Sequence, residues 1–301
     1  MQLQRPIWRT QLIHWLEGLP WVLQGWLVVL LLAVLSALII TYDTETIRPL
    51  HALIPPFQSL QFVLGTDDLG RDLLARLVTG AQFSIGISLT TALVSCLVGG
   101  SVGVWAGWKG GGTDNLLMSV VDFIYSLPGL MVVILLALFL EPSLTTIFSS
   151  WQLAYPSTWA RLLSMVAALS LFSWPQTARL IRGHVQQLKQ ESYIDASRTV
   201  GASFVRLLAK HLLPNLSTSF ALATMVTIPR ALLTESTLSF MGLGIEAPLA
   251  SWGTIASEGW MLVRVTPSIL VLTSVCIVLS MLTFYYLGEV LKRKGDASTA
   301  R

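Results

Sequence analysis

Long apolar runs, separated by shorter polar segments, dominate the pattern of this chain. A membrane-spanning helix needs about 20 mostly apolar residues, and six stretches meet that requirement. They lie at about Trp21–Thr41, Phe83–Trp105, Leu116–Leu140, Leu162–Ile181, Leu216–Leu238 and Ser268–Leu287. The fourth and fifth are the weakest, because they contain Pro175 and Arg230. The pattern therefore predicts an all-α, polytopic membrane protein with six transmembrane helices.

Composition supports the membrane class. The 301 residues are 53% hydrophobic and only 12% charged, and the mean hydropathy is +0.69. An ordinary soluble domain carries about 25% charged residues. The net charge of +3 is concentrated in certain loops, which fits membrane topology better than nucleic-acid binding. Cys96 and Cys276 lie inside apolar runs without a partner at metal-ligand spacing, so we expect neither a disulfide framework nor a zinc site.

The lysines and arginines predict the orientation. With the N-terminus inside, the inside segments hold thirteen of the 19 basic residues: Arg5, Arg9, Lys109, Arg179, Arg182, Lys189, Arg198, Arg206, Lys210, Lys292, Arg293, Lys294 and Arg301. The outside segments hold Arg48, Arg71, Arg76, Arg161 and Arg264. This excess predicts that both termini are cytoplasmic. The first apolar run is longer than the roughly 7–15 residues of a signal-peptide core, so we expect it to be retained.

The segment Glu191–Asn215 is a polar, partly basic island between two apolar runs. It predicts a short amphipathic helix, a turn at Gly201 and a second helix that ends at Pro214. The small side chains of Ala196 and Ser197 would let another protein surface come close. From the residues alone, a docking loop and an ordinary connector on the membrane surface remain equally open.

The segment Leu64–Leu77 carries alternating acids and arginines just before the second apolar run. Thr66 can cap a helix whose first turn holds Asp67. The pairs Asp67–Arg71 and Asp72–Arg76 have the favourable i,i+4 order. A well-capped, ion-paired helix on the outer face is therefore predicted. A metal site on these carboxylates is disfavoured, because the adjacent arginines compete for the charge.

A few ionisable residues lie near span ends and are candidates for a gate or pathway. Glu235 is costly there unless it faces protein or water, so it either lines a gate or positions the loop that follows. Arg230 is about 140° away around a helix, so a direct Arg230–Glu235 pair is not expected. Asp122 caps the third span or belongs to a polar inner vestibule, and Pro128 predicts a kink in that span.

Glycines recur every four residues in the second span, at Gly99, Gly103 and Gly107. This spacing predicts close packing against another helix. The glycine-rich segment Lys109–Asn115 lacks the GxxxxGK[ST] pattern, and the chain shows no other nucleotide-binding motif.

Three motifs in order resemble the C-type permease subunit of ABC importers in the dipeptide/oligopeptide/nickel branch. The first is the coupling loop called EAA, matched by Asp195, Ala196, Ser197, Gly201, His211, Leu213 and Pro214. The second is the outer GTDxxGRD signature, matched by Gly65, Thr66, Asp67, Gly70, Arg71 and Asp72. The third is an LTEASLSFLGLG…PSWG segment, matched by Leu233–Gly253. The loop departs from the family in two places, with aspartate for glutamate and serine for the second alanine.

The resemblance implies a MetI-like permease fold in three parts. Residues 1–82 would hold a cytoplasmic segment, the first transmembrane helix and a periplasmic loop, residues 83–291 the transmembrane domain, and residues 292–301 a cytoplasmic tail. It also implies a place in the bacterial inner membrane and three kinds of partner: a homologous B-type permease, two cytosolic ATPases and a periplasmic or lipid-anchored binding protein. This chain would then have no cofactor and no catalytic role, since ATP and Mg²⁺ would bind the ATPases.

Within that family the expected substrate is a di- or oligopeptide, with nickel or a metallophore, glutathione or another small solute as alternatives. An ion-coupled secondary transporter is a more distant alternative. It would need ionisable residues deep in the spans and inverted repeats, and neither is evident. A membrane enzyme would need a nucleophile–base pair or a set of metal ligands, and the sequence shows no motif for either.

Overall fold

The structure is a computed structural model that describes residues 20–36, 46–153, 155–245 and 249–299. In these residues the secondary structure is helical, apart from an isolated antiparallel bridge between Thr66 and Asp72. The elements are α2 (Trp21–Ser36), η1 (Pro49–His51), α3 (Leu73–Lys109), α4 (Gly111–Ser126), α5 (Gly129–Ser150), α6 (Pro156–Leu188), α7 (Ser192–Thr199), α8 (Phe204–Leu207), η2 (Leu208–Leu212), α9 (Leu213–Phe240), α10 (Trp252–Met261) and α11 (Pro267–Thr299). The predicted all-α fold is confirmed. The N-terminal segment and the end of the first predicted span lie outside the described residues.

Within the described residues, the predicted spans lie in helices, and only the third is interrupted. Four described stretches are long and apolar enough to cross a membrane: α3, α5, the continuous run Phe204–Phe240, and Pro267–Arg293 of α11. The helix α2 is apolar but only 16 residues long as described. The helix α6 has 33 residues but a more polar sequence, in keeping with its place among the weakest predicted spans. The predicted boundary at residue 83 falls inside α3, and α11 continues past residue 292.

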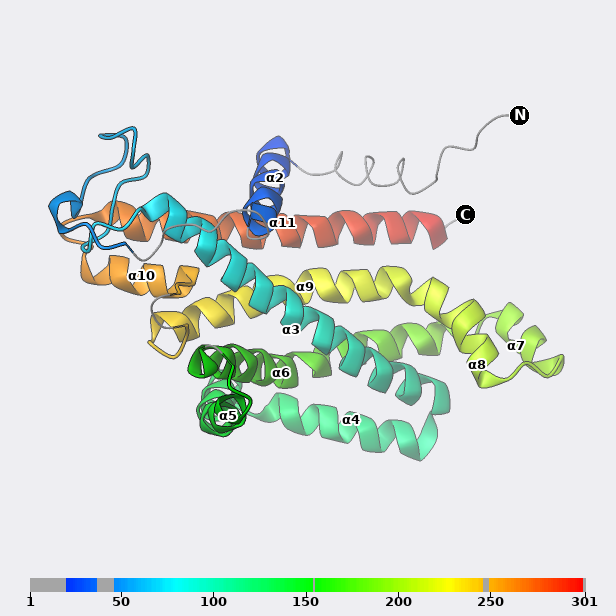
Figure 1. Cartoon of the computed structure of the whole chain (residues 1–301). Coiled ribbons are helices and arrows are strands. Elements are labelled where there is room, and N and C mark those ends of the chain that lie inside the picture. Colours follow the sequence, from blue (N-terminus) through cyan, green and yellow to red (C-terminus); the bar gives the residue numbers. More distant parts are fainter. Residues whose placement is uncertain (1–19, 37–45, 154, 246–248, 300–301) are drawn as a thin grey trace.

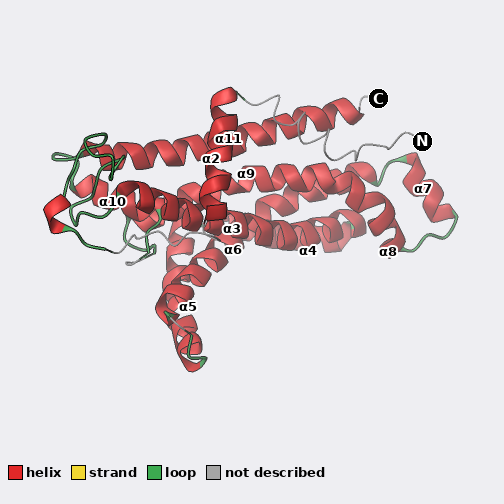
Figure 2. Ribbon diagram, turned by 45° about the horizontal axis from the view of Figure 1, so that its top comes forward, coloured by secondary structure: helices red, strands yellow, loops and turns green. Residues whose placement is uncertain are grey.

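The third predicted span is not one kinked helix, which corrects the expectation. It is two helices, because α4 ends at Ser126 and α5 begins at Gly129. Leu127 is extended (φ −76°, ψ 148°), as expected for a residue that precedes a proline. Figure 2 shows α5 pointing away from the long helices. The helix α5 also runs on through Pro142 to Ser150, ten residues beyond the predicted end of the span at Leu140.

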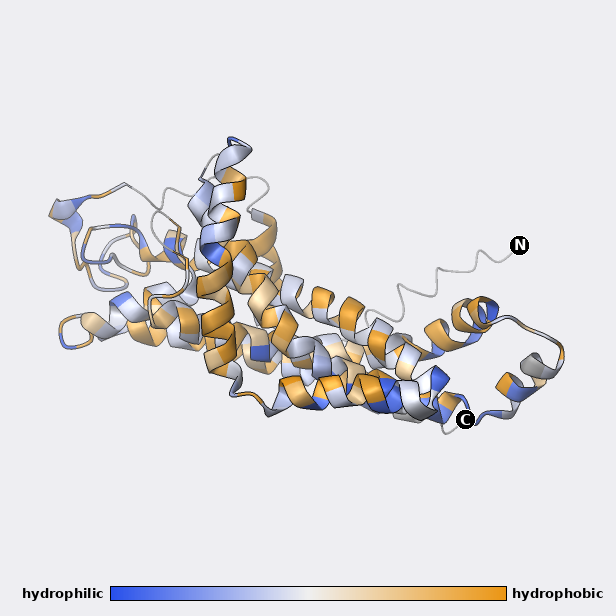
Figure 3. Cartoon of the chain, turned by 90° about the horizontal axis from the view of Figure 1, so that it is seen from below, coloured by the Kyte–Doolittle hydropathy of each residue, from blue (hydrophilic) through white to orange (hydrophobic). Residues whose placement is uncertain are grey.

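The long helices form an elongated bundle with distinct ends. At one end lie the α3–α4 turn, α7, α8 and the C-terminal end of α11 (Figure 1). The segment 46–72 and α10 lie at the other end (Figure 1). Hydrophilic residues concentrate toward these ends, and apolar ones follow the long helices between them (Figure 3). With 37 residues, α3 is about 55 Å long and so exceeds a hydrocarbon core of about 30 Å.

The predicted glycine stripe is confirmed as a helix contact. Gly99, Gly103 and Gly107 face α6. A Cβ at Gly103 would lie 2.5 Å from the backbone oxygen of Ala178, which is fully buried. Glycine therefore allows the two backbones to touch, and α3 and α6 form the most extensive helix pair of the bundle.

We expect Gly103→Ala to destabilise the protein by about 1–3 kcal/mol, because the added methyl group must push α6 away. The matched control is Gly86→Ala in the same helix, where a Cβ meets nothing within 4 Å. That variant should be neutral or gain up to about 1 kcal/mol from helix propensity. Thermal unfolding of the purified protein in detergent measures both, and equal midpoints for the two variants would contradict the packing argument.

Candidate functional site

The residues Gly65–Asp72 of the second motif form a folded turn and not the start of a helix, which corrects the prediction. Thr66 does not cap a helix: its Oγ1 donates to the backbone oxygen of His51 (2.5 Å) and accepts from the backbone N–H of Ile54 (2.9 Å). The cap of α3 is Asp72, which accepts from the backbone N–H of Leu74 at 3.0 Å. Burial raises the pKa of the Asp72 carboxyl, and the hydrogen bond from Leu74 opposes that shift.

Two glycines explain why the helix cannot begin earlier. Gly65 and Gly70 have φ of +86° and +74°, a region that L side chains rarely adopt. A Cβ at Gly65 would lie 2.3 Å from the backbone oxygen of Ile54, and one at Gly70 would lie 1.9 Å from that of Arg48. The motif therefore folds the segment 46–72 back on itself with no room for side chains at either glycine.

A buried ion network joins this turn to α10. The predicted Asp67–Arg71 pair is confirmed at 2.6 Å. Arg76, which is 3% exposed, does not pair with Asp72 as predicted; it binds Asp67 (2.8 Å) and Glu258. The reason is that the Asp72 carboxylate is turned to the helix terminus. Glu258 was not among the predicted site residues, although it is the only acidic residue between 249 and 266.

Glu235 lies inside the protein and does not line an open cavity. It is 0% exposed, and its carboxyl accepts hydrogen bonds from Ser239 (2.7 Å) and Ser236 (3.3 Å) of the same helix. The hydroxyls of Ser84 in α3 and Ser251 at the start of α10 also reach it. Of the two roles considered for Glu235, this geometry favours positioning the loop between α9 and α10 over lining a gate.

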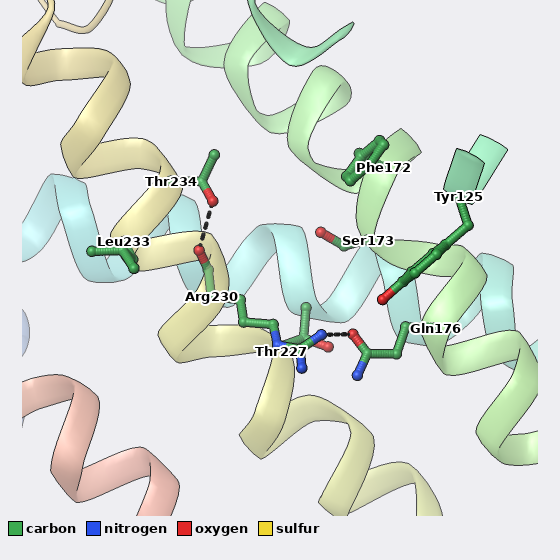
Figure 4. Close-up of a pocket in the computed structure, with 8 residues that line it drawn as sticks. All are labelled: Tyr125, Phe172, Ser173, Gln176, Thr227, Arg230, Leu233 and Thr234. Atoms are coloured by element: carbon green, nitrogen blue, oxygen red, sulfur yellow. Dashed lines mark hydrogen bonds between the residues drawn. The ribbon is translucent and has the colours of Figure 1, made fainter. Parts of the chain in front are cut away.

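Arg230, in contrast, lines a cavity of about 400 Å³ between α4, α6 and α9 (Figure 4). The cavity wall consists of Tyr125, Phe172, Ser173, Gln176, Thr227, Arg230, Leu233 and Thr234. Nη1 of Arg230 donates to Oε1 of Gln176, so no pair with Glu235 forms, as expected. Asp122 lies near the end of α4 and pairs with Arg179 at 2.5 Å. The guanidinium of Arg179 lies 4.6 Å from the ring centre of Tyr125, which joins this pair to the cavity wall.

The polar cavity wall could have been found in the sequence. Ser173 and Gln176 are three residues apart, and Thr227, Arg230 and Thr234 follow a three–four spacing. These spacings place each set on one helix face. The signal is weak, because serine and threonine also occur in lipid-facing and packed positions, where they bond their own backbone.

The loop Glu191–Asn215 has the predicted helix–turn–helix form at its start. Asp195, Ala196 and Ser197 lie on α7, and Gly201 forms the turn with φ of +85°. The second helix does not end at Pro214, which corrects the prediction. It continues through η2, a π-helical turn that contains His211, into α9, where Leu213 and Pro214 occupy the first turn. Pro214 has no N–H to bond a carbonyl of the preceding turn, and the π-helical turn Leu208–Leu212 lies directly before it, where the regular helical hydrogen bonding is interrupted.

Contacts hold α7 against the start of α9 while its outer side stays open. Ile194 is fully buried, and the rings of Tyr193 and His211 lie 5.8 Å apart. Burial raises the pKa of the Tyr193 phenol, which remains neutral and accepts from Asn215 Nδ2 at 3.3 Å. On either side of the turn, Val200 and Val205 are 89% and 71% exposed. Exposed apolar side chains at the tip of a polar loop are typical of a contact surface for another protein.

Comparison with known proteins identifies the family. Residues 99–294 match the family described as the binding-protein-dependent transport system inner membrane component. The chain belongs to this family. The predicted resemblance is thereby confirmed, and the protein is a multi-pass membrane permease subunit.

Several curated relatives are similar over most of the chain. The oligopeptide transport system permease protein OppC of Bacillus subtilis strain 168 is 37% identical over 268 residues, which cover 89% of this chain and 81% of the relative. The dipeptide permease DppC of the same organism is 39% identical over 206 residues, or 68% of this chain and 58% of the relative. The glutathione permease GsiD of Pectobacterium atrosepticum is 28% identical over 294 residues, which cover 97% and 91% of the two chains. The match thus spans less than two thirds of DppC.

A solved structure confirms the fold. An inward-facing form of the MetNI methionine ABC transporter aligns with a TM-score of 0.57 at 17% identity, covering 74% of this chain and 97% of that chain. At this identity the likeness concerns the fold alone. The predicted MetI-like permease architecture is therefore confirmed.

Proposed function

We propose that this chain is the C-type permease subunit of an ABC importer that carries di- or oligopeptides across the bacterial inner membrane. The observation that carries the proposal is the 37% identity, over 89% of the chain, to a permease named for oligopeptide transport. A second similar relative is named for dipeptides. The cavity beside Arg230, whose wall carries Ser173, Gln176 and Thr227 among apolar side chains, agrees with a solute that has both polar and apolar groups.

The membrane orientation belongs to the same proposal. The end of the bundle that carries α7, α8 and the C-terminus of α11 would face the cytoplasm, because the segments there hold most of the basic residues. The segment 46–72 and α10 would face the periplasm and the binding protein. The N-terminal segment, which is expected in the cytoplasm, lies outside the described residues.

The partners follow from what this chain lacks and what it exposes. It has no nucleotide-binding motif, so ATP and Mg²⁺ would bind two separate cytosolic ATPases. Docking of α7 and the Gly201 turn into an ATPase would transmit closure of the ATPase pair to α6 and α9, which flank that loop in the chain. A homologous B-type permease would complete the pathway, and a binding protein would deliver the solute. The solute would then cross by alternating access, as the pathway between the two permeases opens first to the periplasm and then to the cytoplasm.

Glutathione is a second candidate substrate. The observation that favours it is the similarity to GsiD, which extends over 97% of this chain. Glutathione is itself a small peptide, so both candidates share free carboxylates and an amine.

Affinity purification of the tagged chain in mild detergent from its native host tests the proposal. We expect a second permease, ATPase subunits and a binding protein to come with it. Calorimetry with that binding protein then decides between di- or oligopeptides and glutathione. Recovery of the chain alone, or as a homo-oligomer without any ATPase, would overturn the importer assignment and favour an ion-coupled carrier.

A further inference from the structure

The cavity beside Arg230 combines an arginine with a wall of polar and apolar side chains inside a membrane-spanning stretch. Arg230 lies within Phe204–Phe240, which is apolar enough to cross a membrane. At about 400 Å³ the cavity falls in the range of small-molecule pockets. Figure 4 shows Arg230 and Gln176 meeting across it from α9 and α6.

The helices around the cavity supply no carboxylate to Arg230. Their sequences contain three acidic residues, Asp114, Asp122 and Glu235. Asp114 binds Arg182 through both oxygens, at 2.5 and 2.6 Å, and Asp122 binds Arg179. Glu235 is fully buried among serine hydroxyls. Each acid of α4, α6 and α9 therefore has its own partner, and the guanidinium of Arg230 contacts only a neutral amide among the interactions of the described residues.

The neighbouring hydroxyls leave the guanidinium as the principal donor of the cavity. Thr227 donates to the backbone oxygen of Ala223 (2.8 Å), and Thr234 donates to that of Arg230 (2.9 Å). Both hydroxyl protons are thus used within α9. An arginine has five N–H donors in a planar fork that matches a carboxylate, and a cation in a membrane span is costly unless an anion or water faces it.

From this arrangement we infer that Arg230 binds a carboxylate of the transported solute, the C-terminal carboxylate if that solute is a peptide, while Gln176 holds the guanidinium in place. The inference rests on the proposed function, since it names which group of the solute this cavity receives. Tyr125 and Phe172 would pack against the adjoining side chain of the solute.

The test uses the complete importer in proteoliposomes, with its binding protein, and two labelled substrates: a peptide and the same peptide with its C-terminus amidated. Because the binding protein can itself distinguish the two, the quantity compared is the ratio of wild-type to variant uptake for each substrate. We expect Arg230→Gln to lower uptake of the free-acid peptide at least about tenfold, and uptake of the amide less than about twofold. Arg230→Lys should restore part of the loss. The control Arg293→Gln removes an exposed charge outside the cavity and should change neither ratio.

A second measurement holds even if the binding protein rejects the amide. With Cys96 and Cys276 replaced by serine, the thiol of Arg230→Cys is labelled with a cationic methanethiosulfonate in the presence of ATP, Mg²⁺ and binding protein. Saturating free-acid peptide should slow labelling at least about threefold.

The possible results are distinguishable. Equal loss of uptake for acid and amide would overturn the inference, because Arg230 would then support transport without binding the solute carboxylate. Unchanged uptake, or labelling that the peptide does not slow, would show that the solute does not meet Arg230. A wild-type complex that transports neither peptide would instead contradict the proposed function itself.

Discussion

Gly201→Trp is expected to abolish ATP-driven uptake, lowering it at least about 100-fold, while the protein remains in the membrane. Gly201 lies at the tip of the loop between α7 and α8, and a Cβ there meets nothing within 4 Å in this chain. A side chain at this position therefore starts in open space, and the bulky indole would extend toward whatever covers the loop. The backbone at Gly201 has φ of +85°, which residues other than glycine rarely adopt, so the substitution also adds backbone strain. Uptake in membrane vesicles and co-purification of the ATPase, both normalised to the amount of membrane-inserted chain, measure the effect.

The strain and the steric block are separated by a matched variant. Asparagine tolerates the left-handed conformation better than other L residues, so Gly201→Asn should keep the turn and most of the uptake. Gly201→Val, a small but β-branched change, should lose uptake mainly through strain. Normal ATPase recovery and normal uptake by Gly201→Trp would sink the assignment of this loop as the coupling element.

Among single substitutions at the end of the bundle that holds the segment 46–72 and α10, Arg76→Met is expected to be the most destabilising, with a loss of about 3 kcal/mol or more in the free energy of unfolding. Arg76 is almost fully buried and joins Asp67 of the turn in segment 46–72 to Glu258 of α10. Removing it leaves Asp67, itself 1% exposed, with one of its two arginine partners. The loss would weaken the link between α10 and the segment 46–72, of which the longer Arg71–Glu258 contact (3.4 Å) would remain. The midpoint of thermal unfolding in detergent measures it, and limited proteolysis should detect earlier cleavage in 46–72.

Two further substitutions grade this effect. In the wild type, Nη2 of Arg76 binds Glu258 Oε1 at 2.9 Å while Nη1 binds Asp67. Arg76→Lys keeps the charge but cannot make both contacts with a planar guanidinium. Its unfolding midpoint should therefore lie between those of the wild type and Arg76→Met. Arg293→Met removes an exposed i,i+4 pair with Glu289 and should change stability by less than about 0.5 kcal/mol. If Arg76→Met unfolded at the same temperature as Arg293→Met, the Asp67–Arg76–Glu258 network would not be what stabilises the contact between the segment 46–72 and α10.

The helices, the glycine contact and the Gly201 turn could be predicted from the sequence because each depends on neighbours along the chain. An apolar run long enough to span a bilayer must form helix, since no water is available there to bind backbone groups. A glycine every fourth residue makes a smooth face on any helix, whatever its partner. A break before Pro128 is also local, although its size was underestimated: the extended Leu127 separates two helices instead of bending one.

The tertiary structure alone decided where charged side chains find partners. Periodicity paired Asp72 with Arg76, but a carboxylate at a helix terminus binds backbone N–H groups, and Arg76 reaches Glu258, 182 positions away. Glu235 and Arg230 looked equivalent as ionisable residues of one span, yet one is buried among serines and the other lines a cavity. The sequence determined this protein's class, its helices and its family motifs, because these depend on local pattern. Contacts between helices that are distant in sequence decided which of these residues stabilise the fold and which line a cavity. No local sequence pattern contains the geometry of those contacts.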